Sequence, residues 1–286
     1  MFTTDTLSGK TILVTGGGSG LGLSMARHFA RYGANVLICG RTEEKLVAAT
    51  AAIGKENPAV KTGYYIADVR EDEEVGSMIS KIYADFGELN GLVNNAAGNF
   101  YCPSEDLSPN GFKTVVDIVL HGSFNCTRHF GKKLIDAGLP GAVLNIVTTY
   151  TESGSAFVLP SACAKAGVYA MTNSLAFEWA TYGIRLNAIA PGPFPTEGAW
   201  KRLMPNPQVE QVYKQRQPGG RFGEPEELSH LAVFMMSDMA AYMTGECVTL
   251  DGGERLQGGQ FNFVAQMMPR EQLKAMFGAM RPGKKG

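Results

Sequence analysis

A run of glycines near the start of the chain is its clearest chemical feature: Gly16-Gly17-Gly18-Ser19-Gly20-Leu21-Gly22. The apolar segment TILVT, residues 11–15, precedes it, and a helical pattern begins within it. Glycines at such a turn let backbone N–H groups approach a pyrophosphate at the N-terminus of a helix. A glycine run alone is weak evidence, but this position predicts a dinucleotide site. The residues expected to bind it are Gly16, Gly18, Ser19, Gly20, Leu21 and Gly22.

The residue at the end of the second expected strand distinguishes NAD from NADP. An acidic residue there would bind the ribose 2′-hydroxyl, whereas an arginine accommodates a 2′-phosphate. This chain reads Cys39-Gly40-Arg41-Thr42, without an acid before the next helix. Arg41 could also be an ordinary solvated arginine, but its planar guanidinium suits a phosphate. The sequence therefore predicts NADP(H) as the cofactor.

A second set of reactive side chains lies further along the chain. Tyr150 ends the segment Val147-Thr148-Thr149-Tyr150, which closes the fifth expected strand. Active sites of parallel α/β sheets lie at the carboxyl ends of strands. A phenol there can donate a proton, and the amide of Asn99 can donate hydrogen bonds. The plainer alternatives are a half-buried packing tyrosine and a turn-forming asparagine.

Short β-branched runs alternate with helical stretches along the chain, which predicts an α/β fold. The apolar runs are nearly continuous, as expected of strands buried on both faces of a parallel sheet. Right-handed crossovers then give a single Rossmann-type doubly wound sheet with helices on both faces, spanning residues 1–286. The expected strands are residues 11–15, 35–39, 62–67, 91–94, 142–147, 184–189 and 246–250. The expected helices include residues 21–32, one from 43, 71–86 and 270–280.

Two segments depart from this alternation. Residues 191–220 are rich in proline and glycine and too long for an ordinary connection, which favours a lid over the substrate. Residues 252–286 form a C-terminal extension with methionines and a basic end. We interpret the extension as a subunit-packing element.

Composition excludes several classes of function. The formal net charge of −1 does not provide the basic surface that nucleic acids require. No apolar run reaches the roughly 18 residues of a membrane span. The five cysteines and four histidines lack metal-ligand spacing, so no metal is expected and the thiols should be reduced. With Met1 only ten residues before the first expected strand, we expect no targeting peptide and a cytoplasmic protein.

The spacing T-G-x-x-x-G-x-G of residues 15–22 resembles that of short-chain dehydrogenases/reductases. Residues 94–98 (NNAAG) match the N-A-G element of that family, and residues 191–193 (PGP) match its loop beside the nicotinamide. The resemblance implies that Asp68 contacts the adenine, although capping of the next helix explains it nearly as well. Further cofactor contacts are implied at Asn95, Pro191, Gly192, Pro193 and Phe194.

One catalytic element of that family is altered in this chain. Its members usually carry Y-x-x-x-K on a helix, where the tyrosine exchanges a proton with substrate. The lysine lowers the tyrosine pKa and holds the nicotinamide ribose. Here Lys165 is present, but Ser161 stands four residues before it. A serine hydroxyl is too weak an acid to replace the phenol, so ordinary alcohol–ketone chemistry is not expected.

The altered pattern resembles one branch of the family, the 2,4-dienoyl-CoA reductases. The resemblance covers nearly the whole chain. It includes residues 94–100 (NNAAGNF), 107–110 (LSPN), 117–120 (DIVL), 150–165 (YTESGSAFVLPSACAK), 191–203 (PGPFPTEGAWKRL) and 251–254 (DGGE). It implies that Tyr150 and Asn99 face the substrate, while Ser161 and Lys165 support the cofactor side, and we assign all four to catalysis.

The resemblance implies NADPH-dependent reduction of a 2,4-dienoyl-CoA to a 3-enoyl-CoA in unsaturated fatty acid β-oxidation. Hydride delivered to the δ-carbon would send negative charge to the thioester oxygen, which needs donors aimed at it. Arg70, Phe100, Ser108 and Arg202 match substrate-contacting positions of the branch. Their plainer roles are solvated charges for the arginines, core packing for Phe100, and N-capping before Pro109 for Ser108.

Two alternative functions remain open at this point. One is an NADPH-dependent reductase of another acyl thioester, such as a 3-oxoacyl or enoyl thioester. The other is an NADP-binding regulatory protein in which Ser161 marks lost catalysis. The resemblance also implies a homotetramer, with the helix containing Glu178 and the last strand as interfaces.

Overall fold

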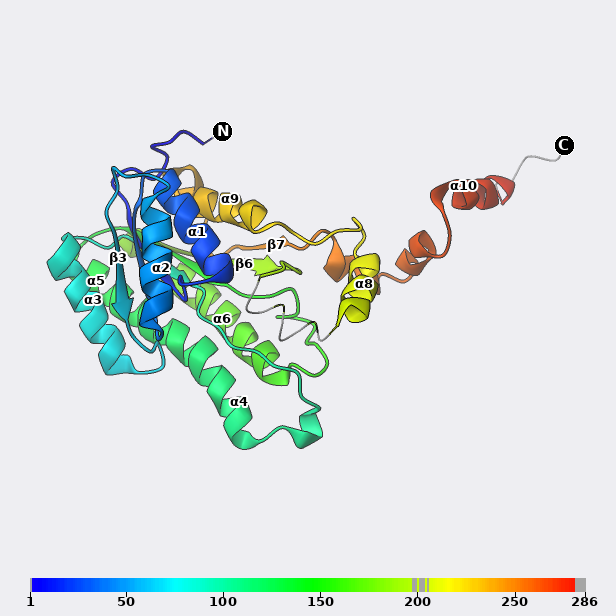
Figure 1. Ribbon diagram of the computed structural model, residues 1–286, viewed down its shortest axis with the longest axis horizontal. Coiled ribbons are helices and arrows are strands. Elements are labelled where there is room, and N and C mark those ends of the chain that lie inside the picture. The colour runs from blue at the N-terminus through cyan, green and yellow to red at the C-terminus, as the bar shows by residue number, and fades with distance from the viewer. Residues whose placement is uncertain (1, 197–199, 201–203, 205, 281–286) are drawn as a thin grey trace.

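The computed structural model describes residues 2–196, 200, 204 and 206–280. Seven parallel strands form one sheet in the order β3-β2-β1-β4-β5-β6-β7 (Figure 1). The strands are β1 (Thr11–Thr15), β2 (Asn35–Gly40), β3 (Thr62–Ile66), β4 (Gly91–Asn94), β5 (Gly141–Ile146), β6 (Ile184–Pro191) and β7 (Cys247–Leu250). The predicted doubly wound parallel sheet is confirmed, with strand ends within two residues of those expected from the sequence.

Helices cover both faces of the sheet. The helices of the described residues are α1 (Gly20–Arg31), α2 (Glu43–Gly54), α3 (Asp72–Phe86), α4 (Pro109–Val116), α5 (Gly122–Ala137), α6 (Leu159–Glu178), α8 (Pro207–Arg216), α9 (Pro225–Met236) and α10 (Arg270–Ala279), and six of them cover the sheet. α1, α2 and α9 pack on one face, and α3, α5 and α6 pack on the other. A π-helical turn (Asp117–His121) joins α4 to α5.

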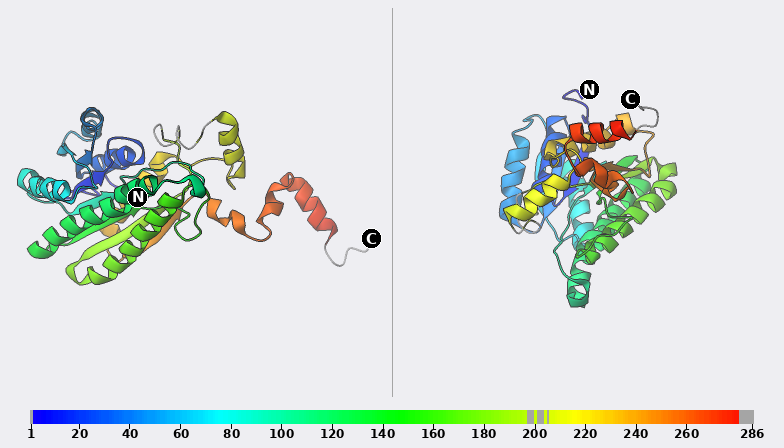
Figure 2. Two further views of the ribbon diagram at one scale, coloured as in Figure 1. Left: turned by 90° about the horizontal axis from the view of Figure 1, so that it is seen from below. Right: turned by 90° about the vertical axis from the view of Figure 1, so that its right-hand side faces the viewer.

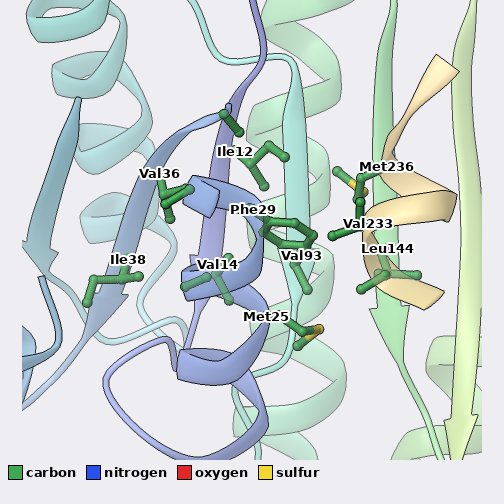
Figure 3. Packing of buried hydrophobic residues seen from close by; sticks show 14 of the residues in the cluster. Ile12, Val14, Met25, Phe29, Val36, Ile38, Val93, Leu144, Val233 and Met236 are labelled. Carbon is green, nitrogen blue, oxygen red and sulfur yellow. The ribbon is translucent and has the colours of Figure 1, made fainter. Parts of the chain in front are cut away.

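The two hydrophobic cores follow from the alternation of side chains along each strand. Every residue of β1 is buried. Ile12 and Val14 point to the α1 side, where they pack with Phe29, whereas Leu13 points to the α3 side (Figure 3). Because successive side chains of a strand face opposite ways, an uninterrupted apolar run supplies both layers at once.

The order of the strands determines where a ligand can bind. β1 pairs with β2 on one side and with β4 on the other, so the chain reverses its direction across the sheet after β3. Loops that leave the carboxyl ends of β1 and β4 therefore diverge toward opposite faces and leave a crevice between them.

Two segments near the C-terminus lie outside this layered body. α8 stands apart from the sheet, within the segment that the sequence predicts as a lid. Asn206 caps α8 by accepting a hydrogen bond from the Val209 N–H at 3.0 Å, and Pro207 occupies its first turn. The last described residues, with two short 3₁₀ turns (Glu254–Gly258 and Asn262–Gln266) and α10, extend away from the body (Figure 2).

The described residues contain neither a membrane-spanning helix nor a cluster of metal ligands. None of their helices has the length and apolar content needed to cross a bilayer. Within the same part of the chain, no three His, Cys, Asp or Glu side chains gather closely enough to hold a metal ion.

Candidate active site

A cleft of about 940 Å³ opens at the carboxyl ends of the strands, where the switch in strand order predicts it. It is lined by residues from the glycine turn, the ends of β2, β4, β5 and β6, the start of α6, and α8. Most of the site residues expected from the sequence meet here: Gly16, Gly18, Ser19, Gly20, Leu21, Arg41, Asp68, Asn95, Asn99, Tyr150, Ser161, Lys165, Pro191, Gly192, Pro193 and Phe194.

The glycine turn brings α1 close to the end of β4. Gly16 has a φ of +65°, a conformation that side chains disfavour. A Cβ at Gly22 would lie 2.5 Å from the Asn95 amide nitrogen and 2.6 Å from the Gly16 carbonyl oxygen. Gly22 does not line the cleft but allows the helix to pack against the turn. The N-terminus of α1 therefore points into the cleft, as a phosphate site requires.

Thr15 and Asn95 connect the two strand ends on either side of the crevice. The Thr15 hydroxyl accepts hydrogen bonds from the backbone N–H groups of Asn95 and Ala96, both at 3.0 Å. The Asn95 amide in turn donates to the Thr15 carbonyl at 3.0 Å. Asn95 therefore shapes the floor of the cleft, and Thr15 is a supporting residue that the sequence pattern does not single out.

Arg41 lies at the rim of the cleft, with 63% of its side chain exposed and its guanidinium 3.9 Å from Asp68. Asp68 is held by Arg70, whose side chain donates to both carboxylate oxygens. These bonds keep the pKa of Asp68 below its usual range. The N-cap position of α3 is Glu71, whose side chain makes no capping hydrogen bond, and Asp68 lies three residues before it, so Asp68 is not the helix cap. Arg41 retains an exposed guanidinium for an anionic ligand.

Tyr150 and Ser161 meet inside the cleft, where a hydrogen bond of 3.2 Å joins their hydroxyl groups. Tyr150 comes from the loop after β5, and Ser161 is buried in the first turn of α6. Asn99 lines the same cleft and accepts a hydrogen bond from the Phe100 N–H at its amide oxygen, at 2.9 Å. The donor end of this amide is then the end that can serve a ligand.

Lys165 is buried in the cleft one helical turn beyond Ser161, and its ammonium group donates to the carbonyl of Ile146. Burial lowers the pKa of Lys165 from 10.5 to about 8. The amine is therefore a donor that can lose its proton near neutral pH.

Three residues predicted to bind substrate do not line the cleft in this structure. Ser108 instead caps α4 by accepting from the Gly111 N–H at 3.0 Å, as its plainer interpretation states. Arg70 is engaged by Asp68, and Phe100 lies on the surface beside the cleft. A fourth, Arg202, falls outside the described residues.

Several cleft residues were not predicted from the sequence. They come from the loop after β4, from the segment around α8 and from the chain after β7, and they include Tyr101, Trp200, Met204, Val209, Val212, Tyr213, Arg216 and Glu254. The aromatic rings of Trp200 and Tyr213 stack with centroids 6.4 Å apart. Local sequence patterns do not reveal such residues, because their place in the cleft depends on how α8 packs.

A parallel sheet in this order, a glycine turn at its switch point and a helix lysine in the cleft define the short-chain dehydrogenases/reductases, and the chain belongs to this family. A family model described as Enoyl-(Acyl carrier protein) reductase matches residues 16–254. The crystal structure of a short chain dehydrogenase from Bacillus anthracis superimposes with a TM-score of 0.80, is 43% identical, and the match covers 90% of this chain and 99% of that one.

Within this family the chain belongs to the 2,4-dienoyl-CoA reductase branch. A probable 2,4-dienoyl-CoA reductase [(2E)-enoyl-CoA-producing] of Bacillus subtilis is 42% identical over 248 residues, which cover 86% of this chain and 97% of the relative. A probable 2,4-dienoyl-CoA reductase 3 [(3E)-enoyl-CoA-producing] of Caenorhabditis elegans is 43% identical over 252 residues, covering 87% and 81%.

Proposed function

We propose that this protein uses NADPH to reduce 2,4-dienoyl-CoA to 3-enoyl-CoA, a step of unsaturated fatty acid β-oxidation. Relatives of the branch are named 2,4-dienoyl-CoA reductases, and several of them are named as producing a (3E)-enoyl-CoA. The single observation that carries the proposal is the placement of Tyr150. Its phenol lies in the cleft beside Ser161, which occupies the helix position where other family members carry the tyrosine.

The cleft fits the cofactor. The N-terminus of α1 and the glycine turn would hold the pyrophosphate, and Arg41 with its exposed guanidinium would bind the 2′-phosphate. Asp68, which lines the cleft, would contact the adenine, and Lys165 would turn from the Ile146 carbonyl toward the nicotinamide ribose. Bound NADPH supplies the hydride.

The substrate chemistry requires donors at the thioester oxygen. When the δ-carbon gains a hydride, electrons move through the diene and the thioester becomes a dienolate. The Tyr150 hydroxyl and the Asn99 amide would donate hydrogen bonds to the oxyanion. Donors that are already in position stabilise such a developing charge by several kcal/mol. Ser161 would hold the Tyr150 hydroxyl in place through their hydrogen bond.

The site of protonation decides the product. A proton added at the α-carbon leaves the double bond between carbons three and four, whereas a proton at the γ-carbon gives a 2-enoyl-CoA. The two relatives are named for different products. We propose α-protonation and a 3-enoyl-CoA product for this chain.

A substrate panel with NADPH tests this function. We expect NADPH oxidation with 2,4-hexadienoyl-CoA, and NMR of the product formed in deuterated water should place deuterium at the α-carbon. Oxidation with acetoacetyl-CoA but not with the dienoyl-CoA would transfer the assignment to a 3-oxoacyl reductase. Absence of single turnover with labelled NADPH on every thioester would favour an NADP-binding regulatory protein.

We also propose that the protein is a cytoplasmic homotetramer. Phe177 at the end of α6 is 90% exposed and Tyr242, just before β7, is fully exposed. β7 is an edge strand, so one side of its backbone has no neighbour in the sheet. Large apolar side chains beside an edge strand are the features that a second copy of the chain would cover.

A further inference from the structure

The part of the cleft formed by α8 and by the residues before it has an apolar wall. Val209 and Val212 of α8 line the cleft, although 41% and 58% of these residues are exposed. Trp200 and Met204 line it as well. Water-exposed apolar side chains directed into a cleft are suited to cover an alkyl chain.

Helix α8 has little of its own to hold it in place. None of its ten residues is buried, and a helix of this length is not stable alone in water. Its position therefore depends on contacts at its ends and on the side chains that join it to other parts of the molecule.

The Tyr213 ring of α8 packs near Trp200 and Phe222, with ring centroids 6.4 and 5.6 Å away, and the chain after β7 adds polar contacts. The Tyr213 hydroxyl donates to the Glu254 carboxylate at 2.6 Å. One turn further along α8, the backbone carbonyl of Arg216 accepts from the side-chain amides of Gln257 at 2.6 Å and Gln266 at 3.2 Å. The start of the C-terminal extension thus fastens the C-terminal half of α8.

We propose that Tyr213 and Glu254 form a specificity-determining pair, which holds the Val209–Val212 wall of α8 against the acyl chain of the substrate beyond the reacting diene. The inference rests on the proposed function and goes beyond it, because it assigns the selection of chain length to a contact with the C-terminal extension. It replaces our sequence-based interpretation of this part of the extension as a subunit-packing element.

The chemistry of the pair suits a fixed contact. A phenol that donates to a carboxylate at this distance forms a charge-assisted hydrogen bond, stronger than a neutral one. Partial burial, together with the bond to Glu254, raises the pKa of Tyr213 well above its usual value. The hydroxyl therefore keeps its proton and remains a donor to Glu254, so Tyr213 acts through α8 as a positioning residue.

The test compares a six-carbon with a twelve-carbon 2,4-dienoyl-CoA. In Tyr213→Phe and Glu254→Ala we expect the KM of the twelve-carbon substrate to rise about tenfold, the loss of one hydrogen bond to a charged group. The KM of the six-carbon substrate should change less than about twofold, because its short tail does not reach the wall, and kcat should be retained on both. Glu254→Gln keeps an acceptor oxygen, so it should raise the KM of the twelve-carbon substrate less than Glu254→Ala does.

Tyr64→Phe is the matched control, since it removes another tyrosine–glutamate hydrogen bond, from the half-buried Tyr64 of β3 to Glu43 at 3.1 Å, and neither residue lines the cleft. It should leave both KM values unchanged. Equal KM changes for the two substrates, or a fall in kcat with unchanged KM, would overturn the inference.

Hydrogen exchange of residues 207–216 in the protein without substrate gives a second readout. Exchange should become about tenfold faster in Tyr213→Phe and Glu254→Ala but not in Tyr64→Phe. Unchanged exchange would overturn the inference. This measurement does not depend on turnover, so it separates failure of the pair from failure of the proposed function, which would show as no wild-type activity on either dienoyl-CoA.

Discussion

At the scale of single residues, Tyr150 reaches the cleft from the loop after β5, whereas Ser161 occupies the helix position four residues before Lys165. The Tyr150 and Ser161 hydroxyl groups lie 3.2 Å apart, so Ser161 can orient the Tyr150 hydroxyl. In the proposed reaction, this exchange would change the direction from which a hydrogen bond reaches the dienolate.

Tyr150→Phe should therefore lower kcat by roughly 100- to 1000-fold, because an oxyanion donor is removed while the ring is kept. Ser161→Ala should lower kcat less, since it removes only the partner of Tyr150. Steady-state kinetics with a dienoyl-CoA measures both. The opposite ranking would assign proton donation to Ser161.

Arg41→Ala should raise the KM for NADPH by roughly 10- to 100-fold, because a hydrogen bond between charged groups is lost. The KM for NADH should change little, because NADH lacks the 2′-phosphate. Comparison of the two cofactors on one substrate checks this expectation. Equal changes would remove Arg41 from the phosphate site.

Lys165 carries a cost to stability, because its burial lowers its pKa from 10.5 to about 8. Below pH 8 the folded protein holds a charge that the unfolded chain solvates better, and this penalty disappears as the pH rises from about 8 to 10.5. We expect Lys165→Met to stabilise the ligand-free protein by about 1–3 kcal/mol at pH 7 and to abolish activity. Urea unfolding at pH 7 and pH 10 measures it. If Lys165→Met increased the free energy of unfolding as much at pH 10 as at pH 7, the increase would not come from removing a buried charge.

At the scale of elements, the turn between β1 and α1 depends on the close approach of Gly22 to Asn95 and to the Gly16 carbonyl. Gly18 lies in the same turn, but a Cβ there would find its nearest neighbours at 3.5 and 3.6 Å, which is ordinary contact. A side chain at position 22 would therefore clash with its neighbours, whereas the structure has room for one at position 18.

Gly22→Ala should destabilise the ligand-free protein by about 1–3 kcal/mol, the usual effect of overpacking, whereas Gly18→Ala should change it by less than about 0.5 kcal/mol. Chemical denaturation measures both variants. Equal losses would mean that the turn tolerates no side chain at either position.

At the scale of the whole molecule, the exposed Phe177 and Tyr242 belong to α6 and to the segment before β7, and neither lines the cleft. If α6 and β7 form the subunit interfaces, Phe177→Glu should reduce the mass measured by light scattering after gel filtration. Val47→Glu on α2 is the control, because Val47 is also exposed but lies on a helix beside β2 and β3, at the opposite side of the sheet. A tetramer in both variants would exclude Phe177 from the interface.

The sequence was sufficient to predict the seven strands, the parallel sheet and the glycine turn. Each of these depends on local periodicity or on a motif whose residues are neighbours in the chain, as in residues 11–22. The positions of Arg41 and Lys165 in the cleft were also predicted from local patterns, because one follows the end of a strand and the other lies on a helix turn.

Tertiary structure decided which side chains share the cleft and which do not. Arg70 bonds to Asp68, Ser108 caps α4, and Tyr213 meets Glu254 across 41 residues of chain. Such pairings arise when separate elements pack, and neither hydrophobic period nor residue spacing encodes them locally. The sequence alone thus determined the sheet and the nucleotide-binding turn, whereas the far wall of the cleft was decided by long-range contacts between α8 and the chain that follows β7.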